Sequence, residues 1–462
     1  MRPRRRPEGP VLLLVLACAV SFFWGRHLGS RVTRPRIPGL PVLHRMLSAD
    51  AEGAVGDGEF VGTGAGAVAP QAIFEDVLDK VQREFVETTS DTARLSNGAL
   101  ARMFASLDDP RTLFLDPPLR RARQEALMGR YQGIGATLAI TRSQKEDVAY
   151  RHLSIVAVLP GSPAEKAGLK PGDRLTEIDG RWIIAYSVAA DISRLQAQKD
   201  LDALQRRENL RQIAQKFQNG LPIHRALSQL MIGQGRSMRL TVQRTGVPHP
   251  LQVTLTTAAT QLSPVGFRTL DGQIGYLRIA QFNRETGRTL TGLLDRMDRK
   301  MKGLVIDLRA NPGGVRSEDL DEVDGVEPAR ALLARLTPGG KVALIERKPA
   351  RKQPFVVPRV ARPLSLPMVV LVDRGTAGLS ELVAAALRDT AGARIVGTRT
   401  FGDGILPLFA VFKNGSGVEM TTARLFTIRG DDLAQGIKPD ITVTEEAGQD
   451  APLRRALALL ET

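Results

Sequence analysis

The sequence predicts a multidomain protein of mixed α+β and α/β structure, and three observations support this. The chain has 462 residues, enough for two or three domains with sizeable cores. Its hydrophobic share of 43% and charged share of 24% are typical of globular proteins. Apolar residues recur at helical spacing in Ala72–Val86, whereas Leu304–Leu308 (LVIDL) is a short, mostly apolar segment of the kind found in buried strands.

Residues 1–30 are predicted to be a signal anchor or a signal peptide. Arg2 and Arg4–Arg6 precede the apolar run Val11–Trp24, which is the layout of an export signal. An uncleaved anchor, a signal cleaved near Ala19–Ser21 and a lipoprotein signal at Cys18 all stay open. We expect an inner-membrane anchored protein with its bulk in the periplasm or outside, or a secreted one. Cys18 is the only cysteine, so the exported part has no disulfide.

Residues 31–70 are rich in Gly, Ala and Pro, which predicts a flexible linker. Residues 71–128 are predicted to be an N-terminal helical segment, with helices at Ala72–Val86 and Leu95–Leu107. A C-terminal helix is expected within residues 446–462.

Residues 129–258 contain Gly- and Pro-rich turns at the segments Tyr131–Ile140 (YQGIGATLAI), Ile155–Gly172 (IVAVLPGSPAEKAGLKPG) and Asp173–Gly180 (DRLTEIDG). In combination they resemble a PDZ domain. The resemblance implies that a loop of Gly133, Ile134 and Gly135 presents N–H groups to a peptide's C-terminal carboxylate, while the peptide adds as a strand. Ile223 and Leu227 of a groove helix, Ile223–Met231, would contact that peptide. A structural module with a self-occupied groove is the alternative.

This module is interrupted by a polar insert at residues 188–218. Its apolar residues recur every three to four positions, which predicts a helix with one packing face. A lid, an oligomer contact, a partner helix and a surface decoration all stay open for its role.

Four motifs follow in residues 259–445. They are LVIDLRANPGG at Leu304–Gly314, GTAGLSEL at Gly375–Leu382, TFGDG at Thr400–Gly404 and AQGIKPDITV at Ala434–Val443. In this order and at these spacings, they resemble the C-terminal processing (tail-specific) serine peptidases. The resemblance covers roughly residues 73–443 and implies a ClpP/crotonase-like α/β peptidase core behind the PDZ domain.

The chain departs from that family at the catalytic positions. Gly378 stands where the family has its nucleophilic serine, Asp403 where it has the lysine that acts as general base, and Pro407 where it has a glutamine. Glycine has no side chain to attack with, and a solvated carboxylate is a poor base at neutral pH. Each loss alone is expected to slow catalysis by about 10⁴–10⁶-fold. The resemblance therefore implies a catalytically degenerate member.

Two residues near these positions have alternative interpretations. Ser380 is either a packed helix residue or a fallback nucleophile, although a spacing of two residues turns it away from the direction of Gly378. Asp403 is expected to be a solvated turn residue between two glycines, with a ligand or metal carboxylate as the alternative. No Cys/His cluster accompanies it, so no metal and no cofactor are expected.

The oxyanion-like turn survives in Asn311–Gly314, directly after the predicted strand Leu304–Leu308. The resemblance implies that an N–H of Gly313 or Gly314 helps to stabilise a tetrahedral intermediate. The alternative is a tight turn that requires glycine for its backbone alone.

The net charge of +15 is high, and the densest basic segment is Lys341–Arg362. It is interpreted as a solvated basic hairpin, with anionic lipid or an acidic peptide as possible partners. No fold signature or aromatic interleaving indicates nucleic-acid binding.

Together these patterns predict an exported, PDZ-containing homologue of C-terminal processing peptidases. We expect a non-catalytic peptide-binding or scaffold protein whose partners are peptide or protein C-termini, an active peptidase or an envelope protein. The alternative is an active serine endopeptidase that cleaves near protein C-termini with a relocated nucleophile such as Ser380.

Overall fold

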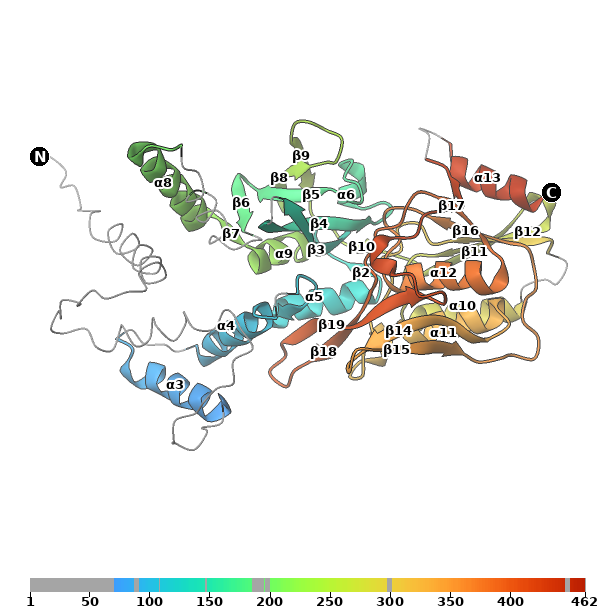
Figure 1. Cartoon of the computed structure of the whole chain (residues 1–462), viewed down its shortest axis with the longest axis horizontal. Helices are drawn as coiled ribbons and strands as arrows, with labels where there is room; N and C mark the ends of the chain where they lie inside the picture. Colours follow the sequence, from blue (N-terminus) through green and yellow to red (C-terminus); the bar gives the residue numbers. More distant parts are fainter. Residues whose placement is uncertain are drawn as a thin grey trace, which may run out of the picture. The chain divides into compact units, whose positions relative to one another are not determined.

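The computed structural model describes residues 70–86, 91–107, 109–145, 148–184, 195, 200–296, 301–444 and 449–461. The chain divides into two compact units, Met1–Thr88 and Thr89–Thr462 (Figure 1). In the first unit the described residues form helix α3 (Pro70–Glu84), close to the predicted helix. Its apolar residues Ile73, Phe74 and Val77 are about half exposed.

The predicted signal segment, nearly all of the predicted linker and residues 185–194 lie outside the described residues. Within the described part, no helix combines the length and the apolar character that crossing a membrane requires.

The second unit begins with helix α4 (Thr92–Ala105), strand β1 (Leu113–Leu115) and helix α5 (Pro117–Leu127). Both helices have an aspartate cap: Asp91 accepts a hydrogen bond from the Arg94 N–H and Asp116 from the Leu119 N–H, each at 2.9 Å. The loop between α4 and β1 carries Arg111, which reaches the candidate site described below.

The module predicted to be a PDZ domain contains the strands β3 (Ala136–Lys145), β4 (Val148–Val158), β5 (Arg174–Ile178), β6 (Arg181–Ile184), β7 (Leu221–Pro222), β8 (Ser237–Gln243) and β9 (Leu251–Thr256). Its helices are α6 (Pro163–Lys166), α8 (Ala203–Asn219) in the insert, and α9 (Ile223–Met231). Strand β3 lies at the edge of this sheet, with β4 as its neighbour. The chain enters the module through β2 (Arg130–Tyr131) and leaves it through β10 (Thr260–Gln261), and these two strands pair with each other.

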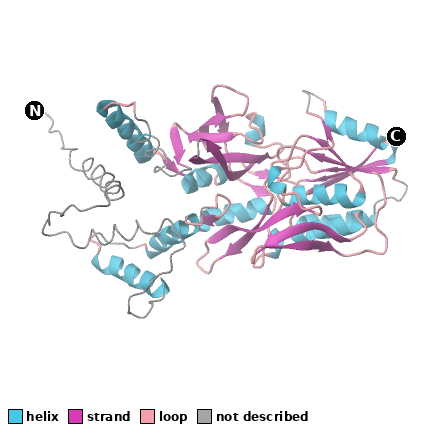
Figure 2. Cartoon of the chain, viewed as in Figure 1, coloured by secondary structure: helices cyan, strands magenta, loops and turns pink. Residues whose placement is uncertain are grey.

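The core is built on a sheet with the strand order β11 (Val265–Leu270), β12 (Ile274–Ile279), β13 (Gly303–Asp307), β16 (Met368–Val372), β17 (Arg394–Gly397) and β20 (Ile441–Thr442). Neighbours are parallel except for β11 and β12, which are antiparallel. Figures 1 and 2 show helices against both faces of this sheet.

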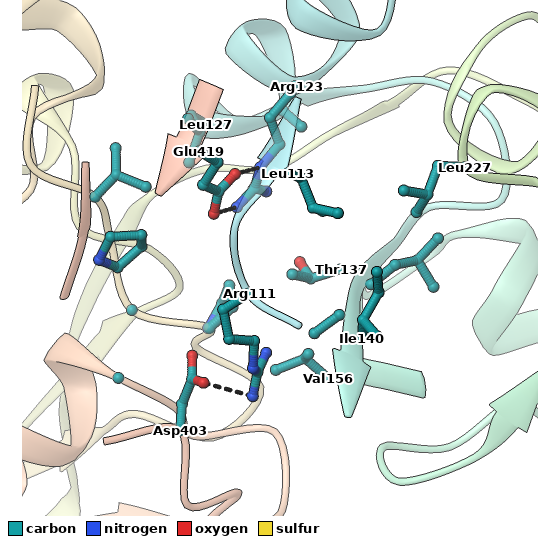
Figure 3. Close-up of a pocket in the computed structure, with 18 of the residues that line it drawn as sticks. Arg111, Leu113, Arg123, Leu127, Thr137, Ile140, Val156, Leu227, Asp403 and Glu419 are labelled. Carbon is teal, nitrogen blue, oxygen red and sulfur yellow. Dashed lines mark hydrogen bonds and ion pairs between the residues drawn. The ribbon is translucent and has the colours of Figure 1, made fainter. Parts of the chain in front are cut away.

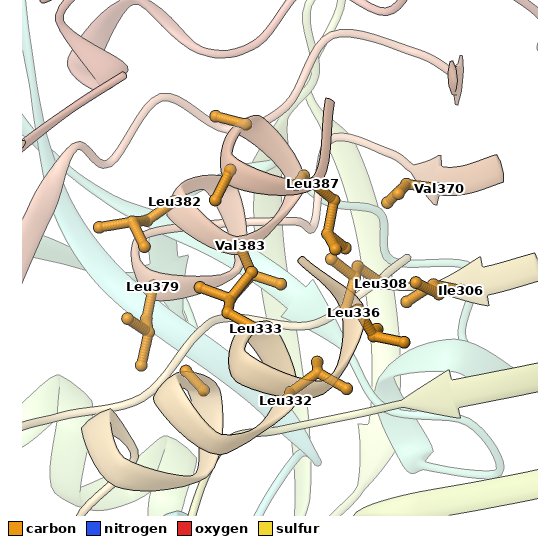
Figure 4. Close-up of a cluster of buried hydrophobic side chains, with 14 of the residues drawn as sticks. Ile306, Leu308, Leu332, Leu333, Leu336, Val370, Leu379, Leu382, Val383 and Leu387 are labelled. Carbon is orange, nitrogen blue, oxygen red and sulfur yellow. The ribbon is translucent and has the colours of Figure 1, made fainter. Parts of the chain in front are cut away.

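Alternation along the strands explains how both faces become buried. Ile306 and Val370 pack into a cluster with helices α10 (Arg284–Arg296), α11 (Val326–Leu336) and α12 (Leu379–Ala391). Figure 4 shows the residues that α11 and α12 contribute. Val305 and Val369, one position away, pack on the opposite face with helix α13 (Ala451–Leu460). Strands buried on both faces are expected to be almost entirely apolar, and Leu304–Leu308 fits this expectation except at Asp307.

A second sheet of the core has the order β1, β19 (Gly417–Thr427), β14 (Gly340–Arg347) and β15 (Arg351–Val357), and β18 (Ile405–Val411) pairs with β19. The segment Lys341–Arg362 includes the β14–β15 hairpin, and its seven basic residues are exposed. Strand β18 directly follows Asp403 and carries Pro407. Short 3₁₀ helices occur at Asp271–Gln273, Asp321–Val323 and Leu433–Gln435.

Candidate functional site

A single cavity joins the PDZ-like module to the core (Figure 3). On the module's side it is lined by the edge strand β3, from Ala136 to Ile140, and by Leu227 and Met231 of α9. On the core's side it is lined by Pro312–Val315, Gly378, Asp403, Ile405 and Pro407. Gly378, Asp403 and Pro407, which the sequence resemblance assigns to catalytic positions, therefore line the same cavity as the expected peptide groove.

Gly378 is the residue before the first turn of α12 and has φ +54° and ψ −118°. L-residues with a side chain rarely adopt this conformation. A Cβ atom built at this position would lie 3.7 Å from Asp403 Oδ2. The Asn311 carbonyl also accepts a hydrogen bond from the Ala377 N–H at 3.0 Å, so the glycine turn, Gly378 and Asp403 meet at one place.

Asp403 is not the solvated turn residue that the sequence suggested. Its side chain is 15% exposed, and its Oδ1 forms an ion pair with Arg111 Nη2 at 2.5 Å. The Arg111 guanidinium also lies over the Phe401 ring, 5.4 Å from its centroid. Burial raises the pKa of the Asp403 carboxyl above its usual range, while Arg111 opposes that rise. The prediction was wrong because the residue that pairs with Asp403 comes from a distant segment of the chain.

A second ion pair lines the same cavity (Figure 3). Arg123 of α5 contacts Glu419 of β19 through two bonds, Nε to Oε2 at 2.6 Å and Nη2 to Oε1 at 2.8 Å. This bidentate geometry fixes both planar groups. Nearby, the Tyr131 hydroxyl donates to Gln281 Oε1 at 3.0 Å and so ties β2 of the module to the core.

Glu381 organises the turn that carries Asp403, and sequence reasoning did not select it. This fully buried carboxylate accepts four hydrogen bonds, from the N–H groups of Gly378, Gly402 and Asp403 and from the Thr400 hydroxyl. Burial raises the pKa of Glu381 to about 7, although the bond from Thr400 opposes the rise. The available signal was its position three residues after the residue that starts the helix, the spacing of a capping box.

Ser380, the fallback nucleophile, is fully buried in α12, and it is not among the residues that line the cavity. Its hydroxyl has no hydrogen-bond partner among the described residues. Thr376 is also buried and donates its hydroxyl hydrogen to the Leu308 carbonyl at 2.8 Å.

The oxyanion-like turn offers one of its two predicted donors. The Gly313 N–H donates to Asn311 Oδ1 at 2.9 Å. The Gly314 N–H has no hydrogen bond to any described residue, and Gly314 lines the cavity. The N–H of Leu379, the first residue of α12, has no described partner either, as expected for the first turn of a helix.

Two of the three N–H groups of the PDZ-like loop Gly133–Gly135 already donate hydrogen bonds to carbonyls of the same module. The Gly133 N–H donates to the Gly233 carbonyl at 3.1 Å, and the Ile134 N–H donates to the Leu230 carbonyl at 2.9 Å. Gly135 has no hydrogen bond from its N–H among the described residues. Leu227 lines the cavity, but Ile223 does not, and Met231 of the same helix does.

The described residues contain no group of three or more His, Cys, Asp or Glu side chains that could hold a metal ion.

Comparisons with known protein families agree with this arrangement. Residues 273–443 match the model of peptidase family S41, and residues 154–200 match a PDZ domain. In the solved structure of a photosystem II D1 C-terminal processing protease, the matched region covers 86% of this chain and 98% of that one, with a TM-score of 0.57 and 24% identity. That similarity shows a shared fold.

Two curated relatives are similar over most of this chain. The chloroplastic C-terminal processing peptidase of Tetradesmus obliquus is 30% identical over 75% of this chain and 68% of its own length. The carboxy-terminal processing protease CtpA of Bacillus subtilis (strain 168) is 26% identical over 79% of this chain and 66% of its own. The chain thus spans about two thirds of the length of these relatives. It belongs to the C-terminal processing peptidases of family S41, with a PDZ domain ahead of the peptidase domain.

Proposed function

We propose that this chain is an exported, non-catalytic peptide-binding or scaffold protein that retains the peptide groove of its family and has lost the covalent serine mechanism. The observation that carries the proposal is the shared cavity, in which the open edge of β3 faces Gly378 and Asp403. A peptide that adds as a strand beside β3 forms backbone hydrogen bonds with the edge of β3. Its side chains then lie in the apolar groove. The nucleophile position beside it has no side chain.

The charge arrangement supports the loss of serine chemistry. A lysine acts as a base only when its ammonium group is destabilised enough to lose a proton. At this position the chain instead has a carboxylate paired with Arg111. The burial of Ser380 and its absence from the residues that line the cavity support this proposal over a relocated nucleophile.

A peptidase assay tests this half of the proposal. The purified protein is expected to leave unfolded protein substrates intact and to escape labelling by a fluorophosphonate probe, with an active family member as the positive control. Turnover or labelling that disappears in Ser380→Ala would instead establish a relocated nucleophile.

Calorimetry with short peptides tests the binding half. Peptides with an apolar, free C-terminus are expected to bind with micromolar affinity, because strand addition provides few anchors. With one loop N–H free, at Gly135, amidation of the terminus should weaken binding about tenfold, the effect of one charge-assisted hydrogen bond. Equal affinity for both forms would assign recognition to the groove alone, and no binding to any peptide of a broad library would leave the module a structural spacer.

The basic and then apolar N-terminus supports export. A fusion of residues 1–70 to a reporter enzyme that is active only outside the cytoplasm is expected to be active. In the same fusion with Arg2 and Arg4–Arg6 changed to Glu, the basic residues that set the membrane orientation are gone, so the reporter should no longer be exported and should be inactive.

A further inference from the structure

The β14–β15 hairpin carries basic residues that the proposed peptide binding does not use. Residues 347–354, which include its turn, are all exposed and contain no acidic side chain. Their basic side chains form the basic tip, which consists of Arg347, Lys348, Arg351 and Lys352. Glu346, the one acid between Lys341 and Arg362, is half-buried and lies in register with Lys352. Its place beside Lys352 leaves the other charges of the tip unbalanced within the hairpin.

Two arginines of the basic tip lie directly opposite each other. The register pairs Arg347 of β14 with Arg351 of β15. Neither guanidinium forms a hydrogen bond or an ion pair with any described residue. Like charges at directly opposite positions destabilise a sheet, so the stability of the hairpin alone favours an acidic or neutral residue at one of the two positions. A local cost in stability of this kind is typical of residues that serve binding.

Further positive charge reaches Arg347 from other elements. Burial lowers the pKa of the Arg347 guanidinium, and the charges of Arg316 and Arg330 lower it further, whereas Glu318 opposes them. Arg316 follows β13 in the chain and pairs with Glu318, and Arg330 of α11 pairs with Glu327 at 3.1 Å. The acidic residues of this region are therefore already paired with other arginines, and the positive charge at the tip is in excess.

The shape of the tip favours a flat partner over a peptide. Eight consecutive exposed residues form a projection, and none of them lines the cavity described above. Strand β15 is at the edge of its sheet, but Pro354 has no N–H to donate, and basic side chains along an edge oppose the addition of another strand. A surface of anionic head groups needs neither a groove nor a free strand edge.

We propose that the basic tip docks the protein onto an anionic lipid bilayer, with its arginine and lysine side chains bound to lipid phosphate groups. The planar guanidinium of arginine presents paired N–H donors that match phosphate oxygens. Residues 347–354 include no large apolar side chain that could enter the hydrocarbon. The contact is therefore peripheral and reversible, and salt weakens it. It goes beyond the proposed peptide binding and is independent of it, because the cavity lies elsewhere on the chain.

The experiment measures how closely the hairpin approaches a bilayer. The full chain carries Cys18→Ser and a fluorophore at Ala350→Cys, and is mixed with vesicles whose head groups bear a quencher. Phosphatidylcholine vesicles are compared with vesicles that also contain phosphatidylglycerol. Quenching should be stronger on the anionic vesicles and should decline as salt is added. Because the signal comes from the hairpin, it does not depend on how the N-terminal segment associates with the vesicle.

A second label position is the positional control. Ala458 is exposed on α13, which packs on the opposite face of the core sheet from α11. A fluorophore at Ala458→Cys should be quenched to the same extent on both kinds of vesicle.

Charge variants then test the arginine pair. Arg347→Gln/Arg351→Gln should weaken docking about 25-fold, since each basic residue near an anionic surface contributes about fivefold. Its melting temperature should be unchanged or higher, because the like-charge pair is gone. Arg207→Gln/Arg211→Gln, at two exposed positions of α8, removes the same charge elsewhere and should dock like wild type.

The proposal is overturned by equal quenching on neutral and anionic vesicles, or by full docking of Arg347→Gln/Arg351→Gln. Saturable binding of soluble polyglutamate without any approach to the vesicles would overturn it in favour of an acidic protein partner. If the double variant fails to fold, Lys348→Gln in the exposed turn gives the same test with one charge, and about fivefold weaker docking is expected.

Discussion

Glu381 Oε2 accepts the Gly378 N–H at 2.8 Å and the Asp403 N–H at 3.0 Å. One buried carboxylate thus fixes the distance between Gly378 and Asp403, the two positions that the sequence resemblance assigns to the nucleophile and the base.

Stability should therefore depend on pH through Glu381. Its folded-state pKa of about 7 lies above the ordinary glutamate value, so burial favours the protonated form. The stability contribution is fully present below about pH 4 and is lost as pH rises through 7. Relative to Glu381→Gln, wild type is expected to lose about 3 kcal/mol of unfolding free energy between pH 4 and 7.5. Urea unfolding of both proteins across this range checks it, and a constant difference would contradict it.

The Arg111–Asp403 pair should be costly to break from one side. Arg111→Met leaves a largely buried carboxylate without its partner and is expected to destabilise the fold by about 2 kcal/mol. The double variant Arg111→Met/Asp403→Asn removes both charges and should recover most of that loss. Denaturant midpoints of the four proteins give the coupling energy. Additive effects would show that the pair contributes nothing to stability.

Restoring a side chain at Gly378 should strain the backbone. At φ +54° and ψ −118°, Gly378→Ala is expected to lower stability by about 1–3 kcal/mol. Gly378→Ser should have a similar cost and still resist a fluorophosphonate probe, because the base position holds Asp403. Thermal melts and gel labelling test the two statements. Labelling of Gly378→Ser at the rate of an active relative would show that the aspartate is a sufficient base.

The C-terminal helix should be held by Arg309. Its guanidinium bonds Asp307 of β13 at 2.7 Å and Asp450, before α13, at 2.8 Å, and Asp307 is fully buried. Arg309→Met is expected to cost about 3 kcal/mol, because the buried Asp307 carboxylate then keeps only the hydroxyl of Tyr276 and a longer contact with Arg278 at 3.5 Å. Limited proteolysis should then release α13. Arg455→Met, on the exposed face of the same helix, is the matched control and should leave the digest unchanged.

Periodic segments were predictable because their patterns are local. The groove helix Ile223–Met231 matches α9. Leu304–Leu308 matches β13 within one position at each end. The order of the four motifs also predicted the family. Each motif could be recognised locally, because its turn requires particular residues at particular positions.

The environment of the site was not predictable in the same way. Arg111 and Glu419 come from segments far from Gly378 in sequence, so no local pattern indicated that they would line the same cavity. The hydrogen bonds of the PDZ-like loop were not predictable either. The N–H groups of Gly133 and Ile134 donate to the carbonyls of Gly233 and Leu230, about a hundred residues later in the chain. A glycine at 133 is compulsory there, since a Cβ would lie 1.9 Å from the Leu230 oxygen.

The pairing of β2 with β10 has a consequence for how the protein can be altered. Both points at which the chain crosses between the module and the peptidase-like core lie side by side, so the module is an insertion in the chain. Residues 132–259 could be removed and the two strands joined by a tight turn, as in a β-hairpin. Such a shortened chain would present the Gly378 end of the cavity without its opposite wall.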